Sequence, residues 1–396
     1  MAIDFQQLYK QVKQFGETAN QREMELQTRR ELASELLQQH ATDLDGLRER
    51  VERVVRSIDP SLRCALPQLE PLDAHFPPPS LPAQATLLAA DGSQISPDRH
   101  AEVDYYLINV GAIQMRLGLS DPPQTITECN LYDSQTNSPT GVITEAVLAL
   151  QRDLREREML ARIAAQAAPP VVTFTDGPME LWGAKESEGE AAAEYQDSLR
   201  KYLEVLRQLN EMRVITAGYV DKPSANLVMR LLEVALLPES ALPDIRKKHP
   251  LQGVTDLGLY RGLLPEGERS AVFKIQSQSA KNYPGELALH FFYLNLGRPG
   301  HPWLARVEIP AWVAHDYGML NSLHAALIEQ CRLMGNRPYP YLLNRAHEVA
   351  LVSLQEKEQV TQMIIMELRR RGLPVGEKSY KQASKDLPGR TGYKKK

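Results

Sequence analysis

The sequence predicts an α/β protein in which a mixed sheet is flanked by helices and preceded by an N-terminal helical arm. Short apolar runs at residues 85–90, 171–175 and 214–220 have the length of buried strands, and helical patterns separate them. Strands in hairpin-like order, followed by strands that alternate with helices, favour a mixed sheet. The chain has 396 residues, of which 43% are hydrophobic and 24% charged, as is typical of globular proteins.

Residues 1–60 are predicted to form the helical arm, a candidate coiled coil. The segment is rich in Gln, Glu, Arg and Leu, and its first proline is Pro60. Apolar residues recur at helical spacing from Leu32 to Val55. Such a stripe is buried, either against the body of the chain, which we favour, or against another subunit.

A proline-rich linker is predicted at residues 61–84, because proline continues neither a helix nor a central strand. The main domain then spans residues 85–375, with a loop-rich insertion at about 238–268. Residues 376–396 are predicted to be a basic, disordered tail, since 378–396 hold seven basic residues and one acid. The tail either contacts nucleic acid or is simply solvated. Further strands are expected at 105–115, 287–296 and 303–309. Helices are expected at 143–168, 191–210, 225–237, 317–334 and 343–371. The last of these ranges is either one helix or two.

Composition excludes several classes of protein. The net charge of −4 argues against an overall basic coat for nucleic acid, and three widely spaced cysteines form neither a disulfide framework nor a cysteine zinc site. No apolar run approaches the length of a membrane span, and the N-terminus lacks a signal-peptide pattern. The sequence therefore predicts a soluble, cytoplasmic protein. Phosphate-binding P-loop, dinucleotide-binding, zincin and serine-hydrolase motifs are all missing.

Two predicted strands end in the same way, with an aspartate followed by glycine. Asp91 follows LLAA and Asp176 follows VTFT. In open α/β sheets the functional crevice lies outside such strand ends, and glycine permits a sharp turn there. Two carboxylates in one place repel each other, and a divalent cation would remove that cost. Oxygen ligands suit Mg²⁺ or Mn²⁺ rather than zinc, although Asp-Gly is also a common turn pair.

Other polar residues could join this site. In the helix at 143–168, Glu158 shares a stripe with Leu154 and Ala161 that is expected to face the sheet, whereas Glu156 lies about 160° around the helix. His347 lies in the first turns of a later helix, where a neutral imidazole could ligate a metal or transfer protons. Each of these residues also has a simple structural explanation. Most acids on helices are solvated, and a lone histidine on a helix is more often merely a satisfied polar residue.

These pieces, in this order, resemble the NurA family of nucleases. The resemblance rests on DGS at Asp91, DGP at Asp176, GYVDKPSANLVMRLL at 218–232, the R-x-E-x-P strand at 306–310 and YPYLLNRAH ending at His347, and it covers about residues 85–355. It implies an RNase H-like core, a homodimer and manganese-dependent cleavage of DNA. It also implies 5′-to-3′ exonuclease and single-strand endonuclease action in DNA-end resection and repair, with a HerA-type hexameric translocase as partner.

The resemblance also implies roles for individual residues. Asp91, Asp176 and His347 match the family's catalytic and metal-binding positions, and Glu158 is the best match for the helix acid, with Glu156 as the alternative. Lys222, Arg306 and Arg345 are candidates for contacting phosphates, and Tyr341 could stack on an unpaired base. Two other functions stay open: a catalytically degenerate adaptor of a DNA translocase, and a different metal-dependent or RNA-directed enzyme on the same core.

Overall fold

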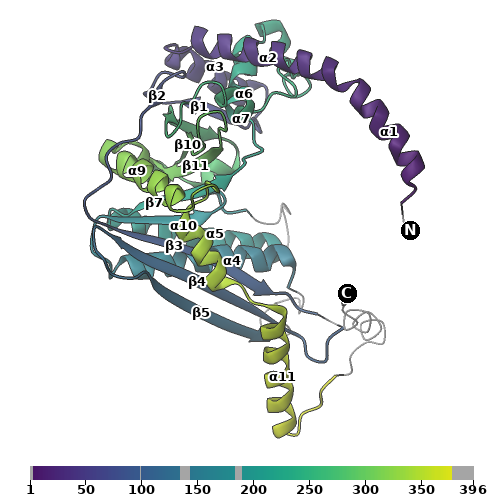
Figure 1. Cartoon of the computed structure of the whole chain (residues 1–396), viewed down its shortest axis with the longest axis vertical. Coiled ribbons are helices and arrows are strands. Elements are labelled where there is room, and N and C mark those ends of the chain that lie inside the picture. The colour runs from purple at the N-terminus through teal and green to yellow at the C-terminus, as the bar shows by residue number, and fades with distance from the viewer. Residues whose placement is uncertain (1–2, 99, 134–142, 183–189, 377–396) are drawn as a thin grey trace. The chain divides into compact units, whose positions relative to one another are not determined.

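The computed structural model describes residues 3–98, 100–133, 143–182 and 190–376, and the chain divides into two compact units (Figure 1). Unit 1 comprises residues 1–82, 177–180 and 216–339. Unit 2 comprises residues 83–176, 181–215 and 340–396. This division differs from the predicted main domain at 85–375, because strand pairing groups the N-terminal segment with residues 216–339.

Unit 2 contains the mixed sheet that the sequence predicts. Its strands are β3 (Ala85–Ile95), β4 (Tyr105–Leu117), β5 (Gln124–Asp133) and β6 (Val171–Asp176). The first three form an antiparallel meander, and β6 pairs parallel to β3, which gives the order β5-β4-β3-β6. An antiparallel meander with a fourth strand parallel to the first is the arrangement expected of an RNase H-like core, and this fold prediction is confirmed.

Helices cover both faces of this sheet. The helices α4 (Glu145–Ala164) and α5 (Glu190–Glu211) pack together, with α4 on β3 and β4. The helix α10 (Tyr341–Ala350) lies across the other face of β3 and β4, and α11 (Leu354–Arg370) follows it (Figure 1). A capping box at Ser353 and Glu356 starts α11 and separates it from α10, so residues 343–371 belong to two helices.

Unit 1 contains an antiparallel sheet. Its strands run in the order β1 (Cys64–Pro67), β9 (Phe273–Gln276), β10 (Leu289–Asn295), β11 (Leu304–Pro310) and β7 (Ile215–Asp221). Two short strands, β2 (His75–Phe76) and β8 (Arg269–Ser270), pair with each other, and β8 also pairs with β10. The segment 61–84, predicted to be a linker, therefore supplies two strands. Proline is tolerated there because Pro67 ends its strand.

The helices of unit 1 include the predicted arm. They are α1 (Phe5–Glu17), α2 (Ala19–Gln39), α3 (Leu44–Ser57), α6 (Leu227–Leu236), α7 (Asp256–Tyr260), α8 (Ala311–Ala314) and α9 (Tyr317–Leu333). The apolar stripe of α2 and α3 is buried against α6 and β1, whereas α1 has no buried residue. Packing against the body of the chain therefore accounts for most of the stripe.

Three other expectations have outcomes here. β3 does not end at Asp91 but continues through Gly92 to Ile95. The insertion at 238–268 holds α7 and a 3₁₀ helix at Glu239–Asp244, and the basic tail from residue 377 lies outside the described residues. Within the described parts of the chain, no helix combines the length and the apolar character that crossing a membrane requires.

Candidate active site

Asp91 and Asp176 occupy neighbouring strands at the point where β3 and β6 stop pairing. The last registered pair is Ala90 with Thr175, and the two aspartates are the next residues of these parallel strands. Neighbouring strands lie about 4.8 Å apart, and residues in register on parallel strands point to the same face of the sheet. Asp176 is exposed and the Asp91 side chain is 20% exposed. The register therefore brings both predicted aspartates to one place on one face.

His347 contacts Asp91 directly. Its Nδ1 lies 2.7 Å from Asp91 Oδ2, while Asp91 Oδ1 accepts a hydrogen bond from the backbone N–H of Gly92 at 2.9 Å. The imidazole itself is 64% exposed. The carboxylate thus orients one ring nitrogen of His347, and the rest of the ring faces solvent.

The end of α10 is fastened to the sheet, and this fixes the position of His347. Ser93 Oγ and Asn109 Nδ2 both donate to the carbonyl of Ala350, the last residue of α10. Gly111, the cross-strand partner of Asp91, has no side chain at the contact, and a Cβ there would lie 2.5 Å from the Ala350 nitrogen. These contacts hold His347, one turn before Ala350, above Asp91.

The acid of α4 that approaches β3 is Glu156. Side chains alternate along a strand, so Gly92 faces α4 while Asp91 faces α10. A Cβ on Gly92 would lie 2.8 Å from Glu156 Oε1. Burial raises the pKa of Glu156 well above its ordinary value, and the nearby charges of Asp153 and Asp91 raise it further. The function of Gly92 is therefore to make room for α4, rather than to form the turn that the sequence suggested.

Asp153, one turn before Glu156, is a further acid of this cluster that sequence reasoning missed. Burial raises its pKa as well, against the stabilising charges of Arg152 and Arg157. Arg152 lies 2.9 Å from Asp153 Oδ1 and 3.5 Å from Glu156 Oε1, so one guanidinium serves both carboxylates. The signal that could have identified these residues is their spacing of three, which places both on one side of a helix.

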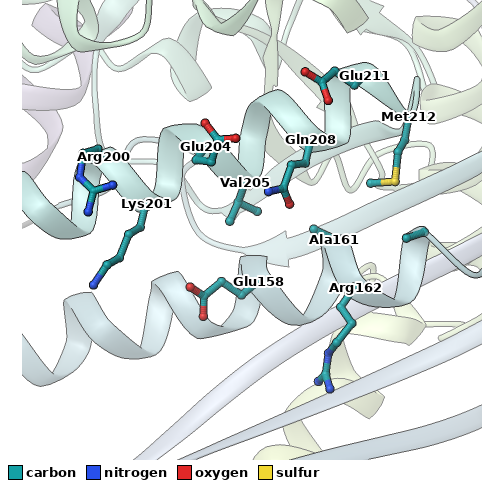
Figure 2. Close-up of a pocket in the computed structure, with 11 residues that line it drawn as sticks. Glu158, Ala161, Arg162, Arg200, Lys201, Glu204, Val205, Gln208, Glu211 and Met212 are labelled. Carbon is teal, nitrogen blue, oxygen red and sulfur yellow. The ribbon is translucent and has the colours of Figure 1, made fainter.

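The structure does not bring Glu158, the first choice for the helix acid, to the other acids. Its carboxylate lies 2.9 Å from Arg155 NH1, and its side chain lines a groove of about 610 Å³ between α4 and α5. Figure 2 shows Glu158 on α4 across this groove from Lys201 on α5. Leu154 and Glu158 also line a second groove, whose other walls come from α5 and from Tyr106 and Tyr132 of the sheet. None of the acids at the ends of β3 and β6 lines either groove. Of the two candidate helix acids, the one that lies against β3 is therefore Glu156.

The residues suggested for contacting DNA have different environments. Arg306 is 6% exposed and its guanidinium is held by Glu308, with 2.7 Å between Arg306 NH2 and Glu308 Oε1, so it does not present a free charge to a phosphate. Lys222 Nζ lies 4.3 Å from the centre of the Trp303 ring. Arg345 pairs with Glu348 on the exposed side of α10, and Tyr341, half-buried, begins that helix.

The donor chemistry of the cluster fits a hard divalent cation. Asp91 and Asp176 offer carboxylate oxygens and His347 offers an imidazole nitrogen on the α10 side of β3, while Glu156 offers its carboxylate from the α4 side. Mn²⁺ and Mg²⁺ accept all of these donors. Burial, and after it the charges of Asp153 and Asp91, raise the pKa of Glu156, and a bound cation would relieve the repulsion between these carboxylates. In the described part of the chain, however, no three His, Cys, Asp or Glu side chains are already arranged as a closed metal site.

The chain is similar to solved structures at low sequence identity. No curated protein matches the chain in sequence. The NurA nuclease from Sulfolobus solfataricus has 11% sequence identity over 75% of this chain and 88% of its own, with a TM-score of 0.45. Human ENDOV has 12% identity over 70% of this chain and 85% of its own, with a TM-score of 0.30.

The decisive comparison is with a family model. The NurA domain model matches residues 85–352, which is well over half of the chain. The match begins at the first residue of β3 and includes Asp91, Glu156, Asp176 and His347. The chain therefore belongs to the NurA family of nucleases.

Proposed function

We propose that this protein is a DNA nuclease that depends on Mn²⁺ or Mg²⁺. The observation that carries the proposal is the register of β3 and β6, which makes Asp91 and Asp176 neighbours, with His347 against Asp91. Membership of a nuclease family supports the reaction class. Phosphodiester hydrolysis needs a positioned water, a proton acceptor or donor, and compensation for charge that develops on phosphate oxygens.

Asp91 and Asp176 would hold the cation, and Glu156 would reach it from the α4 side, past the edge of β3 that β6 leaves unpaired after Ala90. His347 would complete the surroundings of the cation or transfer protons. A bound Mn²⁺ or Mg²⁺ would lower the pKa of a water molecule and stabilise charge on the phosphate and the leaving oxygen. His347 is oriented by Asp91 through Nδ1, which leaves Nε2 for a proton transfer at the leaving group. Before the cation binds, the positive charge of Arg152 stabilises the carboxylates of Asp153 and Glu156, since its guanidinium contacts both.

The decisive experiment is cleavage of single-stranded DNA in Mn²⁺ by the full chain and its matched variants. Glu156→Gln and Glu158→Gln change the same kind of residue two positions apart on one helix. We expect Glu156→Gln, Asp91→Asn and Asp176→Asn to lose at least about 100-fold in rate, and Glu158→Gln to stay within about threefold of wild type. Activity of Asp91→Asn equal to that of wild type would contradict the proposal and favour a degenerate adaptor.

Polarity, partners and assembly are the finer parts of the same proposal. The family suggests 5′-to-3′ exonuclease and single-strand endonuclease action in DNA-end repair, a homodimer and a HerA-type hexameric translocase as partner. End-labelled duplexes read the polarity, because label at the 5′ end is released first only in 5′-to-3′ digestion. Light scattering of the purified chain, alone and mixed with a HerA-type translocase, tests the dimer and the partner. RNA substrates in parallel test the remaining alternative, an RNA-directed enzyme.

A further inference from the structure

A cavity of about 920 Å³ lies in unit 1, and none of its lining residues belongs to the carboxylate cluster. It is formed by the end of β10, the connection from β10 to β11, the end of α9 and the segment that follows α9, together with Glu266 and Gly267. Its size is within the range of small-molecule sites. Most of its wall is apolar, contributed by Leu296, Trp303, Ile328, Cys331 and Pro338.

The buried side chain of Asn295 fixes part of the wall of this cavity. Its Nδ2 donates to the Leu264 carbonyl at 2.8 Å, and its Oδ1 accepts from the backbone N–H groups of Gly297 and Trp303. One amide thus ties together three segments of the wall. A site whose walls are fixed by buried hydrogen bonds does not need to be formed by the ligand, which lowers the cost of binding.

The exposed residues that line the cavity include three arginines, Arg298, Arg332 and Arg337, and one acid, Glu266. Arg298 and His301 are the first and last residues of a tight turn whose central residues are Pro299 and Gly300, and Gly300 has the positive φ of 76° that a type II turn needs. This turn presents Arg298 beside Arg337 and Arg332 of the opposite rim. Arg332 is neutralised by two hydrogen bonds to Glu329. Within the described residues, neither Arg298 nor Arg337 has an ion-pair partner, and both are exposed. The Arg298 guanidinium donates a hydrogen bond to the side-chain oxygen of Asn336, which is neutral.

The aromatic side chain of the wall is held in place. Trp303 Nε1 donates to Asp221 Oδ1 at 2.8 Å, and Lys222 Nζ lies 4.3 Å from the ring centre. An indole fixed at its polar atom offers its ring to a flat ligand at little entropic cost. Guanidinium groups bind phosphate in a bidentate manner, and aromatic rings stack on bases of any sequence. The cavity therefore combines a site for a base with a site for a phosphate.

We infer that this cavity binds a nucleotide, with the base against Trp303 and the phosphate between Arg298 and Arg337. The nucleotide is either free in solution or an unpaired residue of a DNA strand, and the second source rests on the proposed DNA nuclease function. Lys222, suggested from the sequence as a phosphate contact, lies over the indole ring of Trp303. An acidic peptide would find the same arginines but would have no flat group for the indole.

The test is titration of the full chain with dAMP in the presence of EDTA, followed by calorimetry. We expect dAMP to bind at least about tenfold more tightly than deoxyribose 5-phosphate, which lacks the base, and than deoxyadenosine, which lacks the phosphate. Arg298→Ala, Arg337→Ala and Trp303→Leu should each weaken dAMP binding roughly tenfold. The matched control, Arg332→Ala, should change it by less than about threefold, because Glu329 already occupies that guanidinium.

The remaining measurements separate the outcomes. A short 5′-phosphorylated single strand that displaces dAMP identifies DNA as the source, whereas displacement only by mononucleotides identifies a free nucleotide. Equal binding of dAMP and deoxyribose 5-phosphate would overturn the inference. Unchanged binding of dAMP by both arginine variants would also overturn it, as would binding of an acidic peptide but not of dAMP. Asp176→Asn should bind dAMP like wild type, so a failure of the nuclease proposal is distinguishable from a failure of this one.

Discussion

The carboxylate of Glu156 occupies the space that a side chain at position 92 would need. A Cβ on Gly92 would lie 2.8 Å from Glu156 Oε1 and 2.5 Å from Arg152 Cγ. Both distances are shorter than real Cβ contacts, and Arg152 Cγ is not the flexible end of its side chain. Gly92 is thus a condition for α4 to bring its acids to β3.

Gly92→Ala is therefore expected to destabilise the protein by about 1–3 kcal/mol, because α4 must move outward to accept the methyl group. The same movement should lower nuclease activity, since Glu156 would leave β3. Thermal unfolding and DNA cleavage measure the two effects. Gly16→Ala is the control, because an added Cβ there meets nothing within 4 Å. A Gly92→Ala variant with wild-type stability and activity would contradict this account of α4.

On the opposite face, Gly111→Ala is expected to displace α10. The added Cβ would lie 2.5 Å from the Ala350 nitrogen and 2.8 Å from the Val349 carbonyl carbon, and backbone atoms cannot give way as a side chain can. Ser93 and Asn109 would lose their common acceptor, so a loss of about 1–3 kcal/mol is expected. Hydrogen exchange of α10 amides measures the effect directly. Gly262→Ala, at an open position, should leave α10 protected.

His347→Gln should separate catalysis from stability. Because the imidazole is 64% exposed, its ion pair with Asp91 contributes at most about 1 kcal/mol to folding. A group that transfers a proton or completes a cation site contributes much more to the rate, so we expect a loss of about 100-fold in cleavage with little change in Tm. Parallel losses of Tm and activity would show that His347 only anchors α10.

The parts of the fold that the sequence predicted are those with one dominant pattern. The runs VVTFT of β6 and LHFFYLN of β10 are buried on both faces and are mostly apolar, so they resemble strands from sequence alone. β5 alternates between exposed and half-buried residues, with polar groups such as Glu128 and Asn130, and was missed. β1 was missed because the prolines around it dominate the local composition.

The placement of the two aspartates could be predicted because both lie on strands. Asp91 and Asp176 follow apolar runs that can be seen in the sequence, and their register follows from parallel pairing. The helix acid could not be chosen, because α4 packs against both the sheet and α5 and its sequence does not say which buried stripe faces which neighbour. The Asp-Gly pair at 91 misled for a similar reason: glycine serves tight turns and close helix contacts alike.

Acid sensitivity is expected from two buried histidines of unit 1. Burial lowers the pKa of His324 to about 4 and that of His290 to about 4, from an ordinary value of 6.5. His324 Nε2 donates to the Gly267 carbonyl at 2.7 Å, and His290 Nδ1 donates to the Ala288 carbonyl at 2.9 Å, while the other ring nitrogen of each is buried without a partner. Both rings are therefore neutral in the folded protein.

The unfolded chain takes up these protons as the pH falls below about 6.5, while the folded chain does so only near pH 4. Stability is thus fully present above pH 6.5 and is lost between 6.5 and 4, by up to about 1.4 kcal/mol per pH unit for each histidine. His324→Gln keeps a donor for Gly267 but cannot titrate, so its urea midpoint should depend less steeply on pH in this window. His100→Gln, at an exposed position, should keep the wild-type slope. Identical slopes for His324→Gln and wild type would show that His324 is already protonated in the fold.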